Sequence, residues 1–189
     1  MNEITVIFKM VLGMIFLSAS ISKFSDIRGH IYILEEFRIL PIQLVSSFGW
    51  VDAVLEFVVG VSFILGIYQF EISLLSIGLL LIYCFAIILN FYRGRTEISC
   101  GCGGVAGNHK LSKLLVYRNF LLIIFCTWLL WFEPNLGNFN NIVNKSQSFS
   151  DVYSFKFFSL LFISSSILLM YSVTLKLLSI KKQLMNLIV

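Results

Sequence analysis

Residues 72–92 read ISLLSIGLLLIYCFAIILNFY and contain no charged side chain. A helix that crosses a bilayer needs roughly 20 mostly apolar residues, and this run is long enough. Four further runs are also mostly apolar and long enough to span a bilayer, at approximately 4–24, 48–68, 112–132 and 155–178. Apolar residues make up 58% of the 189 residues and charged residues only 13%, which leaves little chain for a soluble domain. We therefore predict an all-α, polytopic protein that is embedded in a lipid membrane.

The five runs predict a four-helix transmembrane bundle and a separate fifth helix. Polar residues form stripes on the first, second and fourth runs, whereas the last run carries only three serines (164–166) at its centre. An Asn/Ser-rich stretch, 134–150, precedes that last run. We expect a membrane domain over 1–133, followed over 134–189 by a linker loop and an additional C-terminal transmembrane helix that packs outside the bundle.

A short amphipathic segment lies between the first two runs. Residues 31–40, IYILEEFRIL, mix apolar and charged side chains, and Pro41 ends the segment. This pattern predicts a short helix at the membrane interface or over the mouth of the bundle. An ordinary surface helix with a solvated charged face explains it equally well. His30, just before it, is expected to be an interfacial surface residue.

Residues 93–104, RGRTEISCGCGG, join the third and fourth runs, and we call this segment the cysteine loop. Cys100 and Cys102 flank Gly101. A disulfide across a single residue closes a small, strained ring, and strained disulfides are more labile than structural ones. Basic neighbours would favour the reactive thiolate, and these are Arg93, Arg95, His109 and Lys110. The pattern predicts Cys100 and Cys102 as redox-active, catalytic thiols.

Other roles for the cysteines remain open. A zinc site would need more ligands than two thiolates and His109 provide, so we expect no metal here. A disulfide that only braces the loop, or a pair of inert thiols, is a further alternative. Cys84 and Cys126 lie inside apolar runs, where a buried cysteine commonly acts as a small apolar residue.

Ionisable residues inside the membrane runs mark a second candidate site, because such groups tend to face a bundle interior or a wet cavity. Asp52 and Glu56 are four residues apart, so both lie on one helix face. Small residues flank that face and allow close packing, and these are Gly49, Ala53 and Gly60. Further polar residues fall near the same end of the other runs: Lys23, Asn90, Arg93, Arg118 and Asn119.

The position of these charges predicts an ion pair beneath the cysteine loop. We expect Glu56 and Arg118 to meet, directly or through Lys23 or Asn119. The pair would support the chemistry of the loop, or it would only fix the register of two helices.

The basic residues predict the orientation of the chain. Membrane helices alternate in direction, so the first loop, the cysteine loop with its continuation and the C-terminus share one face. Eleven Lys and Arg residues fall on that face and three on the other. By the positive-inside rule the cysteine loop is cytoplasmic. The net charge of +4 is explained by these helix-end residues, and we expect no nucleic-acid partner.

Four segments of the chain resemble the methylamine-utilisation MauE family, within the wider DoxX-like membrane proteins. They fall within residues 8–132 and read FKMVLGMIFLSASISKF, VDAVLEFVVGVSFILG, NFYRGRTEISCGCGG and VYRNFLL. They contain the late lysine Lys23, the glutamate Glu56, the Cys-Gly-Cys segment and the Arg118-Asn119 pair. Gly103 departs from the family, which often has an aromatic residue at that position.

The resemblance implies a multi-pass protein of the bacterial cytoplasmic (inner) membrane that works with a thioredoxin-like partner. Such partners assemble disulfides in exported proteins, which implies a loop outside the cytoplasm, in conflict with the charge count. We expect thiol-disulfide exchange at Cys100 and Cys102 that supports maturation of an exported protein. A lipid quinone is a candidate electron partner. The alternative is a non-catalytic membrane assembly component or a small-solute transport component with structural cysteines.

Overall fold

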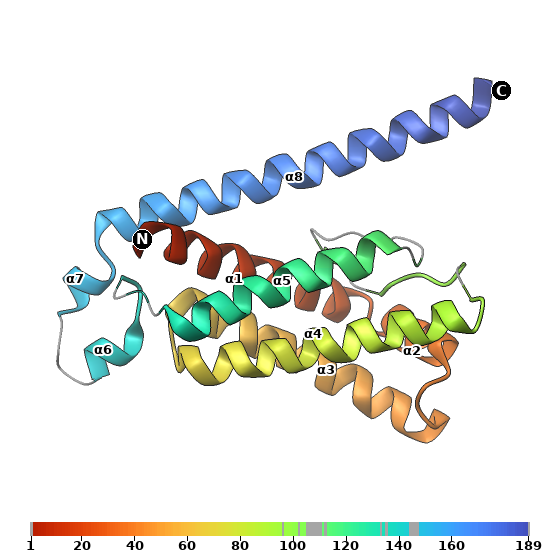
Figure 1. The fold of residues 1–189 in the computed structure, drawn as a ribbon, viewed down its shortest axis with the longest axis horizontal. Coiled ribbons are helices and arrows are strands. Elements are labelled where there is room, and N and C mark those ends of the chain that lie inside the picture. The colour runs from red at the N-terminus through yellow and green to blue at the C-terminus, as the bar shows by residue number, and fades with distance from the viewer. Residues whose placement is uncertain are drawn as a thin grey trace.

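The computed structural model describes residues 2–95, 97–101, 103–104, 111, 113–132, 134, 136–143 and 148–188, which form helices joined by loops (Figure 1). The helices are α1 Asn2–Ser25, α2 Ile27–Phe37, α3 Ile42–Leu65, α4 Gln69–Tyr92, α5 Lys113–Trp131, α6 Phe139–Val143, α7 Phe149–Val152 and α8 Phe155–Ile188. In this described part of the chain, five helices are long and apolar enough to cross a membrane, namely α1, α3, α4, α5 and α8. The prediction of an all-α, multi-pass membrane protein is confirmed.

Two of the predicted boundaries change in the structure. The second membrane helix, α3, begins at Ile42 instead of residue 48, directly after Pro41. It ends at Leu65, because Gly66 adopts the left-handed conformation (φ 69°) and its N–H donates to the Ser62 carbonyl. The short amphipathic helix is present as α2, but it begins at Ile27.

Four membrane helices form one bundle, and the fifth lies outside it. Helix α1 packs against α3 and α5, and α4 packs against α5 and α3, which closes the bundle. Its core is apolar and contains Leu12, Phe16, Val59, Phe63, Leu79, Leu80, Leu122, Cys126 and Leu129. Helix α8 (blue in Figure 1) packs its N-terminal part against α1 and diverges from the bundle toward the C-terminus. Helix α2 packs against α3.

The closest helix pair, α1 and α3, meets at two glycines. A methyl group on Gly60 would lie only 2.8 Å from the Leu17 nitrogen and 3.0 Å from the Gly13 carbonyl oxygen. Further along the same contact, the Ser20 hydroxyl donates to the Ala53 carbonyl oxygen at 3.0 Å. The small residues of the second run thus allow close packing, as the sequence predicted. This contact fixes the height at which α1 presents its late lysine to α3.

We expect Gly60→Ala and Gly78→Ala to change stability in opposite directions. The Gly60 methyl group would overlap backbone atoms that cannot move separately, and overpacking of this kind costs about 1–3 kcal/mol. Gly78 on α4 has no heavy atom within 4 Å of its would-be methyl group. Alanine there should stabilise the helix by about 0.5–1 kcal/mol. Thermal unfolding of both variants in detergent tests this, and equal shifts would contradict the tight α1–α3 contact.

One basic residue of the charge count, Lys9, is buried within α1. Lys9 has no exposed surface, and its ammonium donates to the Gly137 carbonyl oxygen at 2.6 Å. The lysine thereby ties α1 to the turn before α6. Lys23, counted on the opposite face, is buried as well. When both buried lysines are left out, each face loses one basic residue, and the excess stays on the face of the cysteine loop. A cytoplasmic cysteine loop therefore stays a prediction.

Candidate functional site

A buried cluster of ionisable side chains joins α1, α2, α3 and α4. The Lys23 ammonium on α1 lies 2.7 Å from Asp52 Oδ2 and 2.8 Å from Glu56 Oε2, both on α3. The three side chains are 2–4% exposed. Asp52 and Glu56 face the same neighbour because they are one helical turn apart. A single cation therefore holds two carboxylates inside the membrane domain, where an uncompensated charge is costly.

Tyr83 of α4 also contacts both carboxylates of the cluster. Its hydroxyl oxygen lies 2.5 Å from Asp52 Oδ1 and 2.8 Å from Glu56 Oε1, so its proton can serve either carboxylate. The Lys23 ammonium also lies 5.2 Å from the centre of the tyrosine ring, a cation–π distance. Tyr83 is not among the site residues predicted from the sequence. Its heptad spacing to Ser76 and Asn90, both fully buried on α4, is the signal that identifies this face.

The prediction that His30 is a surface residue is wrong. His30 is 7% exposed, and its Nε2 lies 3.0 Å from Asp52 Oδ2. The cause is the early start of α2, whose first turn follows the Asp26 cap and carries His30 under the helix instead of into the preceding loop. Since Asp52 accepts the hydrogen bond, Nε2 is the donor and Nδ1 remains as an acceptor.

The expected ion pair between Glu56 and Arg118 does not occur, and the cation on Glu56 is Lys23. Because α3 begins six residues earlier than expected, Glu56 lies deeper in its helix, at the level set by the α1–α3 contact. Lys23, considered only as an intermediary, is the direct partner. Arg118 and Asn119 instead line a cavity that Glu56 also borders.

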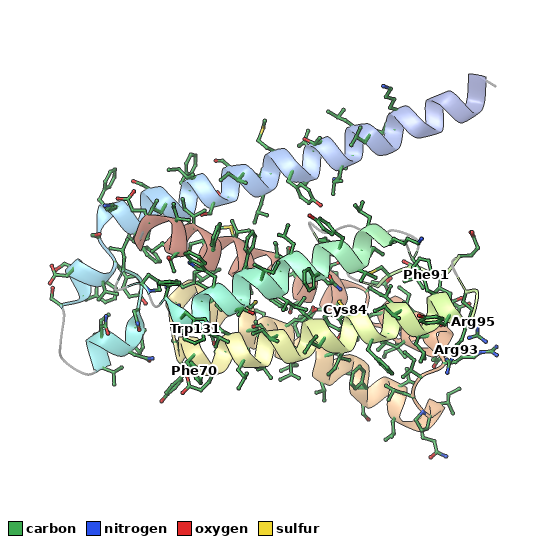
Figure 2. The ribbon with its side chains drawn as sticks, viewed as in Figure 1. Phe70, Cys84, Phe91, Arg93, Arg95 and Trp131 are labelled. Carbon is green, nitrogen blue, oxygen red and sulfur yellow. The ribbon has the colours of Figure 1, made fainter. Side chains whose placement is uncertain are left out.

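Among the described residues of the cysteine loop, one cysteine forms a disulfide. Cys100 is disulfide-bonded and 9% exposed, whereas Cys84 and Cys126 are free thiols. Cys102, together with the predicted thiolate-stabilising residues His109 and Lys110, lies outside the described residues. Cys126 belongs to the apolar bundle core, in agreement with its expected role as a small core residue. Cys84 is half-buried on the α4 side that faces α5 (Figure 2).

The described part of the loop packs over α1 and α2. A methyl group on Gly101 (φ 69°) would lie 3.1 Å from Ile33 and 3.8 Å from His30 Nδ1. On Gly104 it would lie 2.4 Å from the backbone of Ser18, and no side chain fits there. The positive φ and the tight packing explain the glycines of the Cys-Gly-Cys segment. The loop is thus held against the residue that hydrogen-bonds Asp52.

Arg93 and Arg95 bind the end of α2. Arg93 Nη1 donates to the Arg38 carbonyl oxygen at 3.1 Å and, more weakly, to that of Phe37 at 3.4 Å. Arg95 Nη1 reaches the Glu36 carbonyl oxygen at 3.4 Å. Cations are favourable at these terminal carbonyls, where the helix dipole is negative. Both arginines lie at the loop end of α4 with Phe91, far from Phe70 and Trp131 at the other end (Figure 2). These hydrogen bonds connect the C-terminal end of α2 to the end of α4.

A cavity of about 1170 Å³ connects the cluster with the cysteine loop. Its polar lining consists of Lys23, His30, Asp52, Glu56, Tyr83, Arg118 and Asn119. Cys100 and Gly101 line it as well, and apolar side chains from α1, α2, α3, α4, α5 and α8 form most of the rest. Asn90 is fully buried nearby on α4 but donates to the Ala86 carbonyl within its own helix. The cavity can therefore hold a ligand with an apolar body and with polar atoms that reach the cysteine loop.

Comparison with known proteins gives one family. The family model for methylamine utilisation protein MauE matches residues 1–132. A curated methylamine utilization protein MauE from Methylorubrum extorquens is 32% identical over 131 residues, which are 69% of this chain and 70% of that protein. The protein of the same name from Paracoccus denitrificans is 30% identical over 114 residues, 60% of this chain and 61% of its own.

A third relative with this name, from Paracoccus versutus, is 29% identical over 111 residues, 59% of this chain and 60% of its own. The match thus spans about three fifths of the length of both Paracoccus relatives. No solved structure matches the chain.

Proposed function

Because the chain belongs to the methylamine utilisation MauE family of membrane proteins, we propose that it supports methylamine utilisation by thiol-disulfide exchange. In this proposal Cys100 and Cys102 form one redox pair that exchanges with a thioredoxin-like partner. That partner acts in disulfide formation or maturation of an exported protein. The protein resides in the bacterial cytoplasmic membrane, with a four-helix membrane domain over 1–133 and a linker loop and additional C-terminal transmembrane helix over 134–189.

The observation that carries this proposal is the disulfide at Cys100 on the wall of a cavity that the buried ionisable cluster also lines. A disulfide that only braced a loop would need no ionisable groups beneath it. Here Gly101 lies against His30, and His30 is hydrogen-bonded to Asp52. Buried acid–base groups beside a disulfide suit the proton movements of thiol-disulfide exchange, since the attacking species is a thiolate.

The rival function is a small-solute transport or assembly component with structural cysteines. The buried cluster of Lys23, Asp52 and Glu56 supports it, because intramembrane charges also mark solute and ion pathways. The two functions differ in what the thiols do. Exchange requires that the Cys100 disulfide opens and closes in the cell, whereas a transport component keeps it closed throughout.

Thiol trapping in intact cells separates the two functions. We expect the Cys102→Ser variant, in a Cys84→Ala/Cys126→Ala background, to accumulate a reductant-sensitive mixed disulfide through Cys100 with a protein of thioredoxin-like fold. The same variant with Cys100→Ser added is the control and should capture nothing. The absence of any mixed disulfide, with the wild-type pair fully oxidised under all growth conditions, would support the structural role and refute exchange.

The same background decides the side of the membrane. A membrane-impermeant maleimide, added to intact cells after mild reduction, should leave Cys100 unlabelled if the loop is cytoplasmic, as the basic residues predict. Labelling from outside would overturn the sidedness prediction and leave the exchange chemistry standing, with a partner among the exported proteins.

A further inference from the structure

The cavity under the cysteine loop is larger than a packing defect. Its volume of about 1170 Å³ lies above the range of roughly 300–1000 Å³ typical of small-molecule sites. The space lies between the bundle and α8 and is partly open, with lining residues such as Ile82 and Phe85 more than half exposed, so a large ligand can enter it. Helix α8 supplies one wall, through Ile167, Leu168, Tyr171, Leu175 and Leu178.

The lining divides into two chemical parts. Apolar side chains from four membrane helices suit a hydrocarbon chain. The remainder is polar and is formed by the buried ion cluster with Arg118 and Asn119. A lipid acyl chain would match the first part only, and a hydrophilic solute the second part only. The occupant therefore combines a hydrocarbon tail with a polar, uncharged head, because the two cations on this lining, Lys23 and Arg118, balance its two carboxylates, Asp52 and Glu56.

Among the buried polar atoms on this lining, Asn119 Nδ2 and His30 Nδ1 make no hydrogen bond to a described oxygen or nitrogen atom. Asn119 Nδ2 is a donor on a side chain that is 2% exposed, and its polar neighbour is the Cys84 thiol, a weak acceptor. His30 Nδ1 is an acceptor, because Nε2 donates to Asp52. A buried polar group left without a partner is costly, so each atom points to a missing ligand group. The Asn119 Nδ2 donor would pair with a carbonyl oxygen of the ligand, and the His30 Nδ1 acceptor would pair with a hydroxyl group or accept a transferred proton.

These features point to one ligand class. We propose that the cavity binds a lipid-soluble quinone, with its carbonyl-bearing ring at the polar lining and its isoprenoid tail along the apolar walls. Quinone carbonyls accept hydrogen bonds, as Asn119 requires, and the hydroxyls of the reduced form donate them, as His30 Nδ1 requires. The inference rests on the proposed function, for which it names the electron acceptor.

The redox step then balances within the site. A reduced thioredoxin-like partner passes two electrons and two protons to the Cys100–Cys102 disulfide, which becomes two thiols while the partner forms its own disulfide. The two thiols give two electrons and two protons to the quinone. The sulfur–sulfur bond forms again, the thiols are oxidised, and both protons end on the oxygens of the resulting quinol.

Photolabelling tests the site without relying on exchange. The probe is a photoreactive azido-ubiquinone analogue, applied to the full chain in lipid nanodiscs. It is applied to the Cys100→Ser/Cys102→Ser variant, which cannot exchange. We expect labelling of α4 and α5 peptides from the cavity wall, with decylubiquinone competing and oleate not competing. Labelling confined to lipid-facing surfaces, or equal competition by oleate, would overturn the proposal.

Two pairs of variants sharpen the test. Ala86→Phe places a ring inside the cavity and should reduce labelling roughly tenfold or more, since the cavity loses the space for the quinone ring. Ile88→Phe, two residues along α4 and 41% exposed, is the matched control and should not change it. Asn119→Leu should weaken competition by decylubiquinone about tenfold, whereas Ile124→Val, on the same helix but outside the cavity lining and 51% exposed, should have little effect. Unchanged labelling in both Ala86→Phe and Asn119→Leu would refute the site.

The outcomes distinguish this inference from the proposed function. Quinone binding without any mixed disulfide in the trapping experiment would uphold the site and refute exchange at the cysteines. Mixed disulfides, together with photolabelling that is unchanged in Ala86→Phe and Asn119→Leu, would uphold exchange and refute the quinone site.

Discussion

Replacement of Lys23 by methionine is expected to destabilise the protein more than any other single change to the buried cluster. Methionine has a comparable length and keeps the packing, but the substitution leaves Asp52 and Glu56 without the cation that both contact at 2.7–2.8 Å. Removal of one partner from a buried ion pair typically costs about 3–5 kcal/mol. Thermal unfolding in detergent and the level of folded protein in membranes measure the effect.

The exposed ion pair between Lys156 and Glu3 provides the matched control. It joins α8 to α1 at 2.5 Å with both side chains about 60% exposed, so Lys156→Met removes the same kind of charge from solvent. Exposed pairs contribute little, and we expect a small effect. Equal losses for Lys23→Met and Lys156→Met would contradict a buried, charged cluster.

Neutral partners should rescue the Lys23 variant. Asp52→Asn and Glu56→Gln, added to Lys23→Met, remove the two stranded charges, and most of the lost stability should return. Glu56→Gln alone should cost less than Lys23→Met, because Lys23 keeps Asp52 as its partner. A triple variant as unstable as Lys23→Met would show that the lysine acts through its packing and not through its charge.

The sequence predicted the features that depend on local composition. Apolar runs such as 72–92 identify membrane helices because lipid offers the backbone no hydrogen-bond partner outside a helix. The small face of the second run predicted close helix packing, and the Gly13–Gly60 approach between α1 and α3 bears this out. Intramembrane charge also selected Lys23, Asp52 and Glu56, and the structure brings these three together.

The sequence could not predict which cation meets which carboxylate. That choice depends on where each helix begins, and the early start of α3 at Ile42 exchanged Arg118 for Lys23 as the partner of Glu56. His30 was missed for a related reason, because one helical turn added before α2's expected start moves the ring from solvent to Asp52. Tyr83 was missed because a tyrosine inside an apolar run is as often a packing residue as a ligand.

The placement of the cysteine loop could not be predicted from the composition either. Cys-Gly-Cys indicates a disulfide-capable pair, but nothing in the local sequence places it over α2. Gly101 reaches Ile33 and His30 only because Arg93 and Arg95 hold the α2 carbonyl end against the end of α4. These contacts join residues about 55–70 positions apart in the chain, which local patterns do not encode.

Replacement of Cys100 by serine is expected to abolish activity in a maturation assay as fully as the double variant Cys100→Ser/Cys102→Ser. Two thiols that share one disulfide act as a unit, and the loss of either removes the whole redox centre, so their effects do not add. The disulfide at Cys100 supports this unit, and the same outcome is expected for Cys102→Ser. The measured quantity is the yield of correctly oxidised exported protein.

The two free cysteines provide the internal control. Cys126→Ala removes a thiol from the bundle core and Cys84→Ala one from the half-buried α4 surface, and both lie away from the described disulfide. Each should leave the maturation yield nearly unchanged, at most with a small loss of stability from the vacated volume. Full activity in the double loop variant, together with inactivity of Cys84→Ala or Cys126→Ala, would place the chemistry inside the bundle and refute exchange at the loop. A partial loss for each single variant that becomes complete only in the double variant would show that each thiol works alone. The cavity wall at Cys100 would then serve a single nucleophile and not a dithiol.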